Sequence, residues 1–141
     1  MAIVVDANLL VVLVNNDPRG EQVLIQFTDW IERGVPLHAP DLALYEVANS
    51  LTRSVVAATF FENELTAAWN FLSHLPITYH PIVSGTRVIE IALSLRRQSA
   101  YDAAYLALAE TLGAELWTLD GPLYRNATGQ GFAVRLLGES V

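Results

Sequence analysis

The chain has 141 residues, of which 52% are hydrophobic; it carries a formal net charge of −7 and contains no cysteine. This length corresponds to about one ordinary domain, and the missing cysteines exclude disulfides and cysteine-ligated zinc sites. All eight basic residues are arginine, and an acidic chain is a poor general binder of polyanions because phosphate contacts dominate nucleic-acid affinity. The apolar stretches are too short and interrupted for a signal peptide or membrane span, so we expect one cytoplasmic domain over residues 1–141.

Short apolar strands and amphipathic helices alternate along the chain. Residues 2–5 form a continuous, mostly β-branched run, which is typical of a buried strand. In chain order, we expect a strand at 2–5, helices near 8–14 and about 20–33, a strand at 35–39, helices at about 41–58 and 63–75, a strand within 77–83, helices at about 85–97 and 100–112, and strands at 114–120 and 131–137. Strands separated by helices predict an α/β fold in which a parallel sheet carries helices on both faces.

Two aspartates directly follow expected strands. Asp6 follows the first strand, and Asp120 ends the strand at 114–120. Ligands of open α/β sheets bind beyond the carboxyl ends of the strands, so both carboxylates are expected at one edge of the sheet. Structural roles stay open for both: Asp6 suits an Asx turn, and Asp120 precedes Gly121 and Pro122, a pattern common in turns and at helix N-caps.

Two further acids lie on expected helices. Asp102 is the only charge between residues 101 and 109 of a helix that is apolar nearly all round, and such helices are usually buried. Its carboxylate is therefore expected beside the interior, where the helix N-terminus favours negative charge; a capping box with Ser99 is the structural alternative. Glu46 shares a polar helix face with Arg53, and this face suits either solvent or a crevice.

Carboxylates that gather in one crevice repel each other, so a cation is expected to neutralise them. A purely oxygen donor set favours hard ions, Mg²⁺ or Mn²⁺, and these ions suit phosphoryl chemistry because they activate water and stabilise a leaving oxygen. The three histidines, His38, His74 and His80, lack metal-ligand spacing and are expected at a strand end or on a helix surface.

Other sites that use an aspartate after the first strand fit this sequence poorly. Aspartyl-phosphate phosphatases resemble Asp-x-Asp-x-Thr, but Asn8 and Leu10 stand where the second aspartate and the threonine are needed. Phosphatases and receiver domains also use a lysine near the phosphate, and this chain has none. Neither a Gly-x-Gly-x-x-Gly motif after the first strand nor a Gly-Lys-Ser/Thr motif is present, so dinucleotide and P-loop sites are not expected.

Four segments together resemble the ordered motifs of PIN domains, and of the VapC toxins among them. The segments are VVDANLL (4–10), YEVANSL (45–51), YDAAYLALAE (101–110) and TLDGPLYRNA (118–127). The resemblance covers the whole chain, and it implies a three-layer α/β/α fold around a central parallel sheet of about four to five short strands.

The resemblance also assigns roles to individual residues. It implies an acidic quartet that binds metal and acts in catalysis: Asp6, Glu46, Asp102 and Asp120. Asn8 and Thr118 match polar positions of the family, and we interpret both as groups that orient carboxylates, water or phosphate. The polar face of Glu46 is then expected to line the crevice.

The activity implied by the resemblance is that of a Mg²⁺- or Mn²⁺-dependent endoribonuclease. Metal-bound water, deprotonated with help from a carboxylate, would attack an RNA phosphodiester in line, with transfer RNA or ribosomal RNA as the expected substrate. Single-stranded loops are where sequence-specific reading of RNA is physically easiest. Candidate phosphate contacts are Arg53, Arg96, Arg97 and Arg125, although Arg96 and Arg97 also suit a helix C-terminus.

The resemblance further implies a homodimer and a VapB-like antitoxin whose tail crosses the active site. Apolar residues available for such contacts, or else for the core, are Val23, Phe27, Trp30, Val55, Val56, Phe60 and Phe61. The alternative to a nuclease is a catalytically inactive PIN-like module that binds RNA or a partner. Metal-dependent RNA cleavage separates the two hypotheses.

Overall fold

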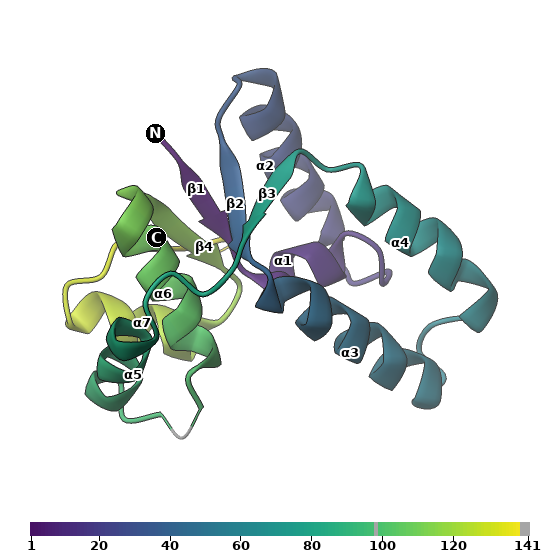
Figure 1. The fold of residues 1–141 in the computed structure, drawn as a ribbon. Helices are drawn as coiled ribbons and strands as arrows, with labels where there is room; N and C mark the ends of the chain where they lie inside the picture. The colour runs from purple at the N-terminus through teal and green to yellow at the C-terminus, as the bar shows by residue number, and fades with distance from the viewer. Residues whose placement is uncertain (98, 139–141) are drawn as a thin grey trace.

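The computed structural model describes residues 1–97 and 99–138 (Figure 1). In chain order its elements are β1 (Ile3–Val5), α1 (Ala7–Val12), α2 (Gly20–Glu32), β2 (Leu37–Pro40), α3 (Leu42–Val56), the 3-10 helix η1 (Glu62–Glu64), α4 (Leu65–Ser73), β3 (Ile77–His80), α5 (Gly85–Ser94), α6 (Tyr101–Leu112), β4 (Glu115–Thr118), α7 (Gly121–Gly129) and β5 (Val134–Leu136). The alternation of strands and helices predicted from the sequence is confirmed.

The five strands form one parallel sheet in the order β3-β2-β1-β4-β5. Right-handed crossovers then place α1 to α4 on one face of the sheet and α5 to α7 on the other, as Figure 1 shows. The predicted three-layer α/β/α architecture is therefore confirmed. The chain moves outward from β1 through β2 to β3 and then returns to β4 on the other side of β1, so the order reverses between β1 and β4. In parallel α/β sheets this reversal opens a crevice beyond the strand ends.

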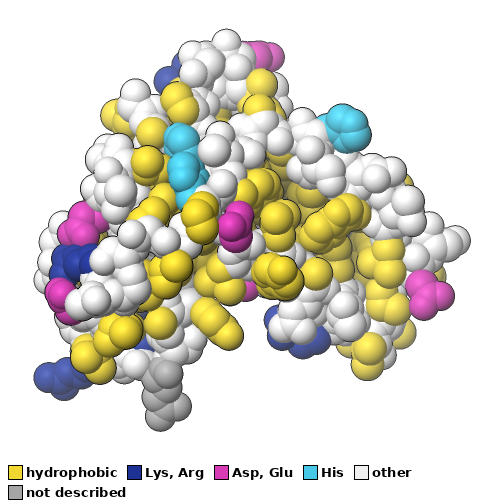
Figure 2. All heavy atoms as spheres, viewed as in Figure 1, with side chains coloured by type: hydrophobic (Ala, Val, Ile, Leu, Met, Phe, Trp, Pro, Cys, Tyr) yellow, Lys and Arg dark blue, Asp and Glu magenta, His cyan; other side chains and the backbone are white. Residues whose placement is uncertain are grey.

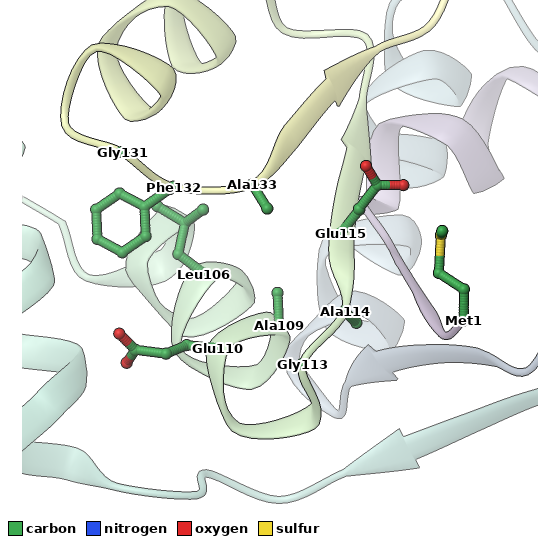
Figure 3. A pocket seen from close by; sticks show the side chains of 10 residues that line it. All are labelled: Met1, Leu106, Ala109, Glu110, Gly113, Ala114, Glu115, Gly131, Phe132 and Ala133. Atoms are coloured by element: carbon green, nitrogen blue, oxygen red, sulfur yellow. The ribbon is translucent and has the colours of Figure 1, made fainter.

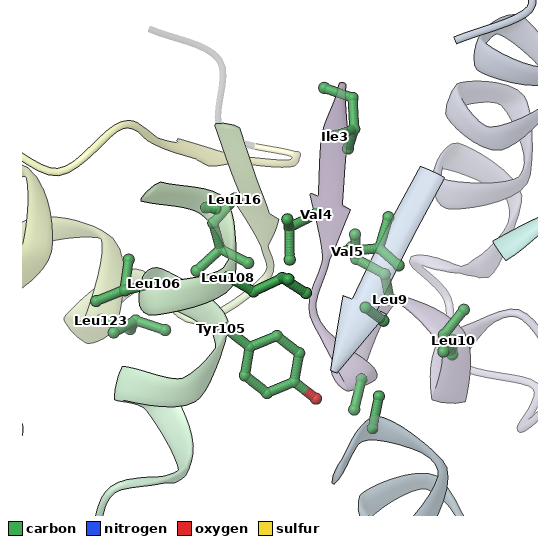
Figure 4. Packing of buried hydrophobic residues seen from close by; sticks show 14 of the residues in the cluster. Ile3, Val4, Val5, Leu9, Leu10, Tyr105, Leu106, Leu108, Leu116 and Leu123 are labelled. Atoms are coloured by element: carbon green, nitrogen blue, oxygen red, sulfur yellow. The ribbon is translucent and has the colours of Figure 1, made fainter. Parts of the chain in front are cut away.

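Strand β1 lies at the centre of the hydrophobic core. Its Val4 and Val5 are fully buried, because helices cover both faces of the sheet. On the α6 side Val4 packs near Tyr105 and Leu108, and Figure 4 shows the Tyr105 ring below β1 with its hydroxyl directed away from α6. Helix α6 is buried on nearly all sides, as its apolar sequence predicts.

Helix α2 packs its aromatic residues inward. The Trp30 ring forms edge-on contacts with Phe27 at 5.2 Å and with Trp117 of β4 at 5.1 Å between ring centroids. Val23, Phe27, Trp30 and Phe60 are all buried, so for these four residues the structure agrees with the core alternative and not with a partner contact. Positions 23, 27 and 30 share one helical face, and this face is the one that α2 lays against the sheet.

Helix α7 is absent from the sequence prediction, which left 121–130 without an element. The sequence here favours a turn because of Gly121, Pro122 and Gly129. Proline is nevertheless well suited to the first turn of a helix, because its missing N–H needs no partner there. The side chain of Asp120 caps this helix by accepting a hydrogen bond from the Leu123 backbone N–H at 3.0 Å. The N-cap alternative for Asp120 is therefore observed.

Helices α1 and α2 approach closely at Gly20. A Cβ atom added at this glycine would lie 2.5 Å from the carbonyl oxygen of Val12, so no side chain fits there without backbone movement. The loop between the two helices, residues 13–19, is thereby held against the carboxyl edge of the sheet. No helix in the described ranges is long and apolar enough to cross a membrane.

Candidate active site

Asp6 is a buried carboxylate at the carboxyl end of the central strand. It is only 8% exposed, and its backbone N–H donates to the carbonyl oxygen of Trp117 at 3.0 Å, which holds it at the start of the crevice between β1 and β4. Although Asp6 occupies the N-cap position of α1, its side chain makes no capping hydrogen bond. The carboxylate is thus free of the structural role that an N-cap would give it.

A hydrogen-bond network ties Asp6 to the end of β4. The Thr118 hydroxyl donates to Asp6 Oδ2 at 2.8 Å, and Asn8 Nδ2 donates to the same oxygen at 3.3 Å. Asn8 also donates to Thr118 Oγ1 at 3.2 Å and accepts from the Leu119 backbone N–H at 3.2 Å. The backbone N–H of Asp120 donates to Thr118 Oγ1 at 3.0 Å. Two residues that the sequence analysis singled out, Asn8 and Thr118, therefore join the ends of both strands.

Glu46 reaches the crevice from α3, in the helical layer of α1 to α4. Helix α3 buries Val47 and Leu51 against the core, and the neighbouring face of the helix carries Glu46, Ser50 and Arg53 along one wall of a cavity. The Tyr105 hydroxyl donates to Glu46 Oε1 at 2.6 Å. The expectation that the polar face of α3 lines a crevice, rather than open solvent, agrees with this placement.

Asp102 lies in the first turn of α6, on the other side of the crevice. Its Oδ2 faces the Nε of Arg97 at 3.8 Å, a distance that gives ionic attraction without a hydrogen bond. Residue Ala100 is the N-cap of α6, and Ser99 Oγ accepts from the Tyr101 backbone N–H at 3.2 Å. The capping box between Ser99 and Asp102 is therefore not formed, since the cap position falls one residue later.

The four acids line one polar cavity of about 390 Å³ at the carboxyl edge of the sheet. Its floor contains Asp6 and Asn8, and Asp120 and Asp102 lie on the β4 and α6 side. The remaining polar lining residues are Asn15, Asp17 and Arg19 of the α1–α2 loop and Glu46, Ser50 and Arg53 of α3. Side chains from distant parts of the chain thus converge on one solvent-accessible space.

Burial, together with neighbouring carboxylates, raises the pKa values of Asp6, Glu46 and Asp102. Burial raises the pKa of Asp6 from its ordinary value of 3.8 to about 7; the Thr118 hydrogen bond opposes this rise, and the charges of Glu46 and Asp102 add to it. Burial also raises the pKa of Glu46, against the Tyr105 hydrogen bond, with a contribution from Asp102. The pKa of Asp102 is raised by burial, lowered in part by Arg97 and raised by Asp120. A cation in the cavity would relieve this repulsion.

The spacing of the acids differs from that of a closed metal cage. Within residues 1–97 and 99–138, no three aspartate, glutamate or histidine side chains are gathered tightly enough to hold one ion in common. The donor set is nevertheless all oxygen, and Mg²⁺ usually keeps several waters and is held by one or two carboxylates together with substrate phosphate. The chemistry of the residues therefore fits a partly hydrated hard ion.

The four candidate phosphate-binding arginines differ in position. Arg53 lines the cavity, and Arg97 lies beside Asp102. Arg96 and Arg125 are exposed and are not among the described residues of the cavity wall. Arg96 adopts a left-handed conformation with φ of 57° just after α5, where it forms part of the helix C-terminal turn, as the alternative to an RNA contact predicts.

Two side chains in and around the cavity, Tyr105 and Arg19, were not predicted from the sequence. Tyr105 follows Asp102 by one helical turn, and a lone phenol on a buried apolar helix is the signal that would have found it. Arg19 lines the cavity while it pairs with Asp17, whose Oδ2 accepts from Arg19 Nη2 at 2.9 Å. Arg19 lies in an irregular loop, where no periodicity in the sequence predicts the direction of its side chain.

A second cavity of about 410 Å³ lies at the opposite, amino-terminal edge of the strands (Figure 3). Met1, Leu106 and Phe132 give it largely apolar walls. Its two acids are already neutralised, because Glu110 pairs with Arg87 at 2.8 Å and Glu115 pairs with Arg135 at 2.8 Å. Among the described residues, Asp6, Glu46 and Asp120 of the first cavity form no ion pair with an arginine, and Asp102 has only the longer contact with Arg97. That cavity is the candidate active site.

One exposed apolar surface lies around α3 and α4. Two adjoining cavities of about 390 and 260 Å³ share Trp69 and are bounded by Leu51, Leu65 and Leu72. Val56 and Phe61 are 83% and 70% exposed, in contrast to the buried aromatic residues of α2. Figure 2 shows hydrophobic side chains across this face of the molecule.

Comparison with known protein sequences identifies relatives that match most of the chain. Ribonuclease VapC3 from Pyrobaculum aerophilum is 35% identical over 129 residues, which cover 87% of this chain and 92% of that protein. Ribonuclease VapC12 from Mycobacterium tuberculosis is 37% identical over 123 residues, which cover 86% and 88%. The resemblance to VapC proteins predicted from four motifs is thus confirmed.

Solved structures share the fold. The crystal structure of PAE2754 from Pyrobaculum aerophilum aligns with a TM-score of 0.71 at 21% identity over 95% of this chain and 83% of that chain. FitAcB from Neisseria gonorrhoeae aligns with a TM-score of 0.57 at 18% identity over 94% and 95%. The PIN domain profile matches residues 3–128, a range that contains all four acids of the cavity. The chain belongs to the PIN domain family.

Proposed function

We propose that this protein is a Mg²⁺- or Mn²⁺-dependent endoribonuclease and the toxin of a toxin–antitoxin pair. The observation that carries the proposal is the convergence of Asp6, Glu46, Asp102 and Asp120, from four separate segments, on one polar cavity. The relatives that match most of the chain bear the name ribonuclease, which supports the same activity.

A partly hydrated metal ion would be held by one or two carboxylates of this acidic quartet at a time. Asp6 and the other three carboxylates supply hard oxygen donors. The pKa values of Asp6, Glu46 and Asp102 are raised mainly by burial and further by neighbouring carboxylates, and both effects favour a bound cation. A bound divalent ion would supply Lewis-acid activation of the phosphodiester and of the attacking water. The protein's own part is to hold the carboxylates in place: Thr118 and Asn8 fix Asp6, and the α7 N-terminus fixes Asp120.

Arginines at the edges of the cavity would bind the RNA backbone. Arg53 and Arg19 lie on the side of α3 and the α1–α2 loop, and Arg97 lies on the side of α6. Guanidinium groups pair well with phosphate, and their position offsets the repulsion that an acidic chain exerts on RNA. Of the four arginines named from the sequence, we retain Arg53 and Arg97 as phosphate contacts.

The substrate we propose is structured cellular RNA, namely transfer RNA or ribosomal RNA, cut at a single-stranded site. A flexible loop can enter an open cavity of this size, whereas a regular A-form helix hides its bases in a deep groove. A VapB-like antitoxin would bind the apolar surface around Trp69 between α3 and α4, and we further propose a homodimer.

The test is cleavage of total RNA by the purified protein, freed of any bound partner. Reactions contain Mg²⁺, Mn²⁺ or EDTA, and Asp102→Asn and Asp29→Asn proteins run alongside. Asp29 is an exposed aspartate on α2 that pairs with Arg33 at 2.8 Å, so its variant controls for the loss of one negative charge.

Discrete fragments are expected with either metal for the wild type and for Asp29→Asn, and none with EDTA or Asp102→Asn. Cleavage that persists in EDTA would contradict metal dependence. If the folded protein binds Mn²⁺ but leaves total RNA, transfer RNA and intact ribosomes uncut, the acidic cavity is not catalytic. The hypothesis of an inactive binding module would then replace that of a nuclease.

A further inference from the structure

Glu46 and Asp102 stand on helices that lie on opposite faces of the sheet. Helix α3 belongs to the layer of α1 to α4, and α6 belongs to the layer of α5 to α7 (Figure 1). The sheet that separates the layers ends at the cavity, so nothing in the strands fixes the distance between these two acids. A separate contact is needed to set it.

Tyr105 provides this contact. Its hydroxyl donates to Glu46 Oε1 at 2.6 Å, and this is the one side-chain hydrogen bond between α3 and α6 among the described residues. Tyr105 also follows Asp102 by three residues on α6, so both side chains project from neighbouring positions on the same helix face. The carboxylate of Glu46 is thus tied to the helix that carries Asp102.

The Tyr105 ring is firmly held. The residue is 1% exposed and packs in the core below β1, where Figure 4 shows it among Val4, Leu108 and Leu116 with its hydroxyl directed away from α6. A packed ring has few rotamers to choose from, so the direction of its O–H is set by the core. Glu46, by contrast, sits on an open wall of the cavity and has a flexible side chain.

We propose that Tyr105 is a positioning residue that holds Glu46 against the Asp102 side of the cavity. The phenol donates to one carboxylate oxygen, Oε1, and leaves Oε2 available to a bound cation. This inference rests on the proposed metal-dependent nuclease and assigns to it a residue outside the acidic quartet. Tyr105 touches neither substrate nor metal in this role and acts through Glu46, the side chain to which its hydroxyl donates.

The test compares Tyr105→Phe with Tyr79→Phe. The first variant removes the hydroxyl and keeps the ring that the core needs. Tyr79 is a half-buried phenol of β3 that lines the separate cavity near Trp69, so its variant controls for the loss of a tyrosine hydroxyl away from Glu46. Mn²⁺ binding is measured from the signal of the free ion in electron paramagnetic resonance, and RNA cleavage is measured as kcat and KM.

Tyr105→Phe is expected to weaken Mn²⁺ binding by about 10-fold and to lower kcat by about 10-fold with KM for RNA unchanged, because groups that orient a metal ligand typically have effects of this size. Tyr79→Phe is expected to match the wild type. In a Glu46→Gln background, Tyr105→Phe should change Mn²⁺ binding no further, since the residue acts through Glu46.

The outcomes separate this inference from the proposed function. If Tyr105→Phe binds Mn²⁺ and cleaves RNA like the wild type, the positioning role is overturned and the nuclease proposal is unaffected. A drop in melting temperature with unchanged activity per folded molecule also overturns it, because it shows a purely structural tyrosine. If the wild-type protein binds Mn²⁺ but cuts no RNA, and Tyr105→Phe binds Mn²⁺ more weakly, the nuclease proposal is contradicted and the positioning role of Tyr105 is supported. Wild-type protein that binds no Mn²⁺ overturns both.

Discussion

The hydroxyl of Thr118 donates to Asp6 Oδ2 across 2.8 Å and thereby joins the ends of β4 and β1. The same oxygen of Thr118 accepts from the Asp120 backbone N–H and from Asn8, so one hydroxyl organises three neighbours. Thr118 is fully buried, and water cannot replace these contacts. Thr118, together with Asn8, therefore holds the ends of β1 and β4 in place at the carboxyl edge of the sheet.

Replacement Thr118→Val keeps the shape of this side chain and removes its hydroxyl. Buried hydrogen-bonding groups would lose their partner, so we expect the free energy of unfolding to fall by about 1–3 kcal/mol in chemical denaturation. Loss of the hydrogen bond that lowers the pKa of Asp6 should also shift the acidic limb of the cleavage pH profile to higher pH. Thr111→Val, at a partly exposed hydroxyl that bonds only the Ala107 carbonyl of its own helix, should change neither quantity. A pH profile that does not move would contradict the link between Thr118 and Asp6.

Asp6 makes the stability of the metal-free protein depend on pH. Its folded-state pKa of about 7 lies above the ordinary value of 3.8, so between these values the folded chain holds a proton that the unfolded chain has released. This group's contribution to stability is complete below the lower value and is lost as the pH rises through the upper one. Deprotonation above this window leaves a charge in a buried position.

Asp6→Asn removes this titration. In EDTA we expect the variant to gain stability over the wild type as pH rises from about 5 to about 8, by about 3 kcal/mol across the range. The difference between the two proteins, measured by urea unfolding, cancels the titration of other groups such as His38, whose pKa is lowered by burial and by His80. Asp29→Asn should give a difference that does not vary with pH, and a flat difference for Asp6→Asn would refute the raised pKa.

The close approach of α1 and α2 gives a prediction that does not involve the acids. A Cβ at position 20 would lie 2.5 Å from the Val12 carbonyl oxygen, so Gly20→Ala must move backbone, and we expect a loss of about 1–3 kcal/mol in unfolding free energy. At Gly129 a Cβ would meet nothing within 4 Å, so Gly129→Ala serves as the control and is expected to be neutral or slightly stabilising. Equal stability of the two variants would contradict the tight α1–α2 contact.

Arg53 and Arg125 are expected to differ in their effect on RNA. Arg53 lines the cavity, whereas Arg125 is exposed on α7 outside the described cavity wall. We expect Arg53→Gln to raise KM about 10-fold and to reduce the dependence of log affinity on log salt by about one unit, because one phosphate contact is lost. Arg125→Gln should leave both unchanged. An Arg125 variant with the larger effect would place the RNA path on the other side of the cavity.

The strands and the acids that follow them were predictable from the sequence for a simple physical reason. A buried parallel strand needs a short apolar run, and the polar residue that ends the run marks the carboxyl edge, as Asp6 and Asp120 do. The resemblance to PIN domains added Glu46, whose amphipathic helix alone does not say whether its polar face meets solvent or a crevice.

Other features depend on tertiary contacts that sequence periodicity does not contain. Helix α7 was not predicted because a proline and two glycines in its sequence favour a turn. Its stability comes instead from the Asp120 cap and from its packing on β5. The burial of Phe27 and Trp30 depends on which face of α2 meets the sheet. The hydrogen bond from Tyr105 to Glu46 joins residues from different layers, and only the folded chain reveals it.

The sheet order β3-β2-β1-β4-β5 has a consequence for the protein during its own synthesis. Asp6 directly follows β1, whereas its partner Thr118 ends β4 and the fourth acid, Asp120, follows β4. A nascent chain that has not reached β4 leaves one edge of β1 unpaired, and its Asp6 lacks the hydrogen bond from Thr118. A chain that has not reached β4 therefore has an incomplete set of carboxylates, and the proposed cleavage of RNA would arise only after β4 and Asp120 have been made.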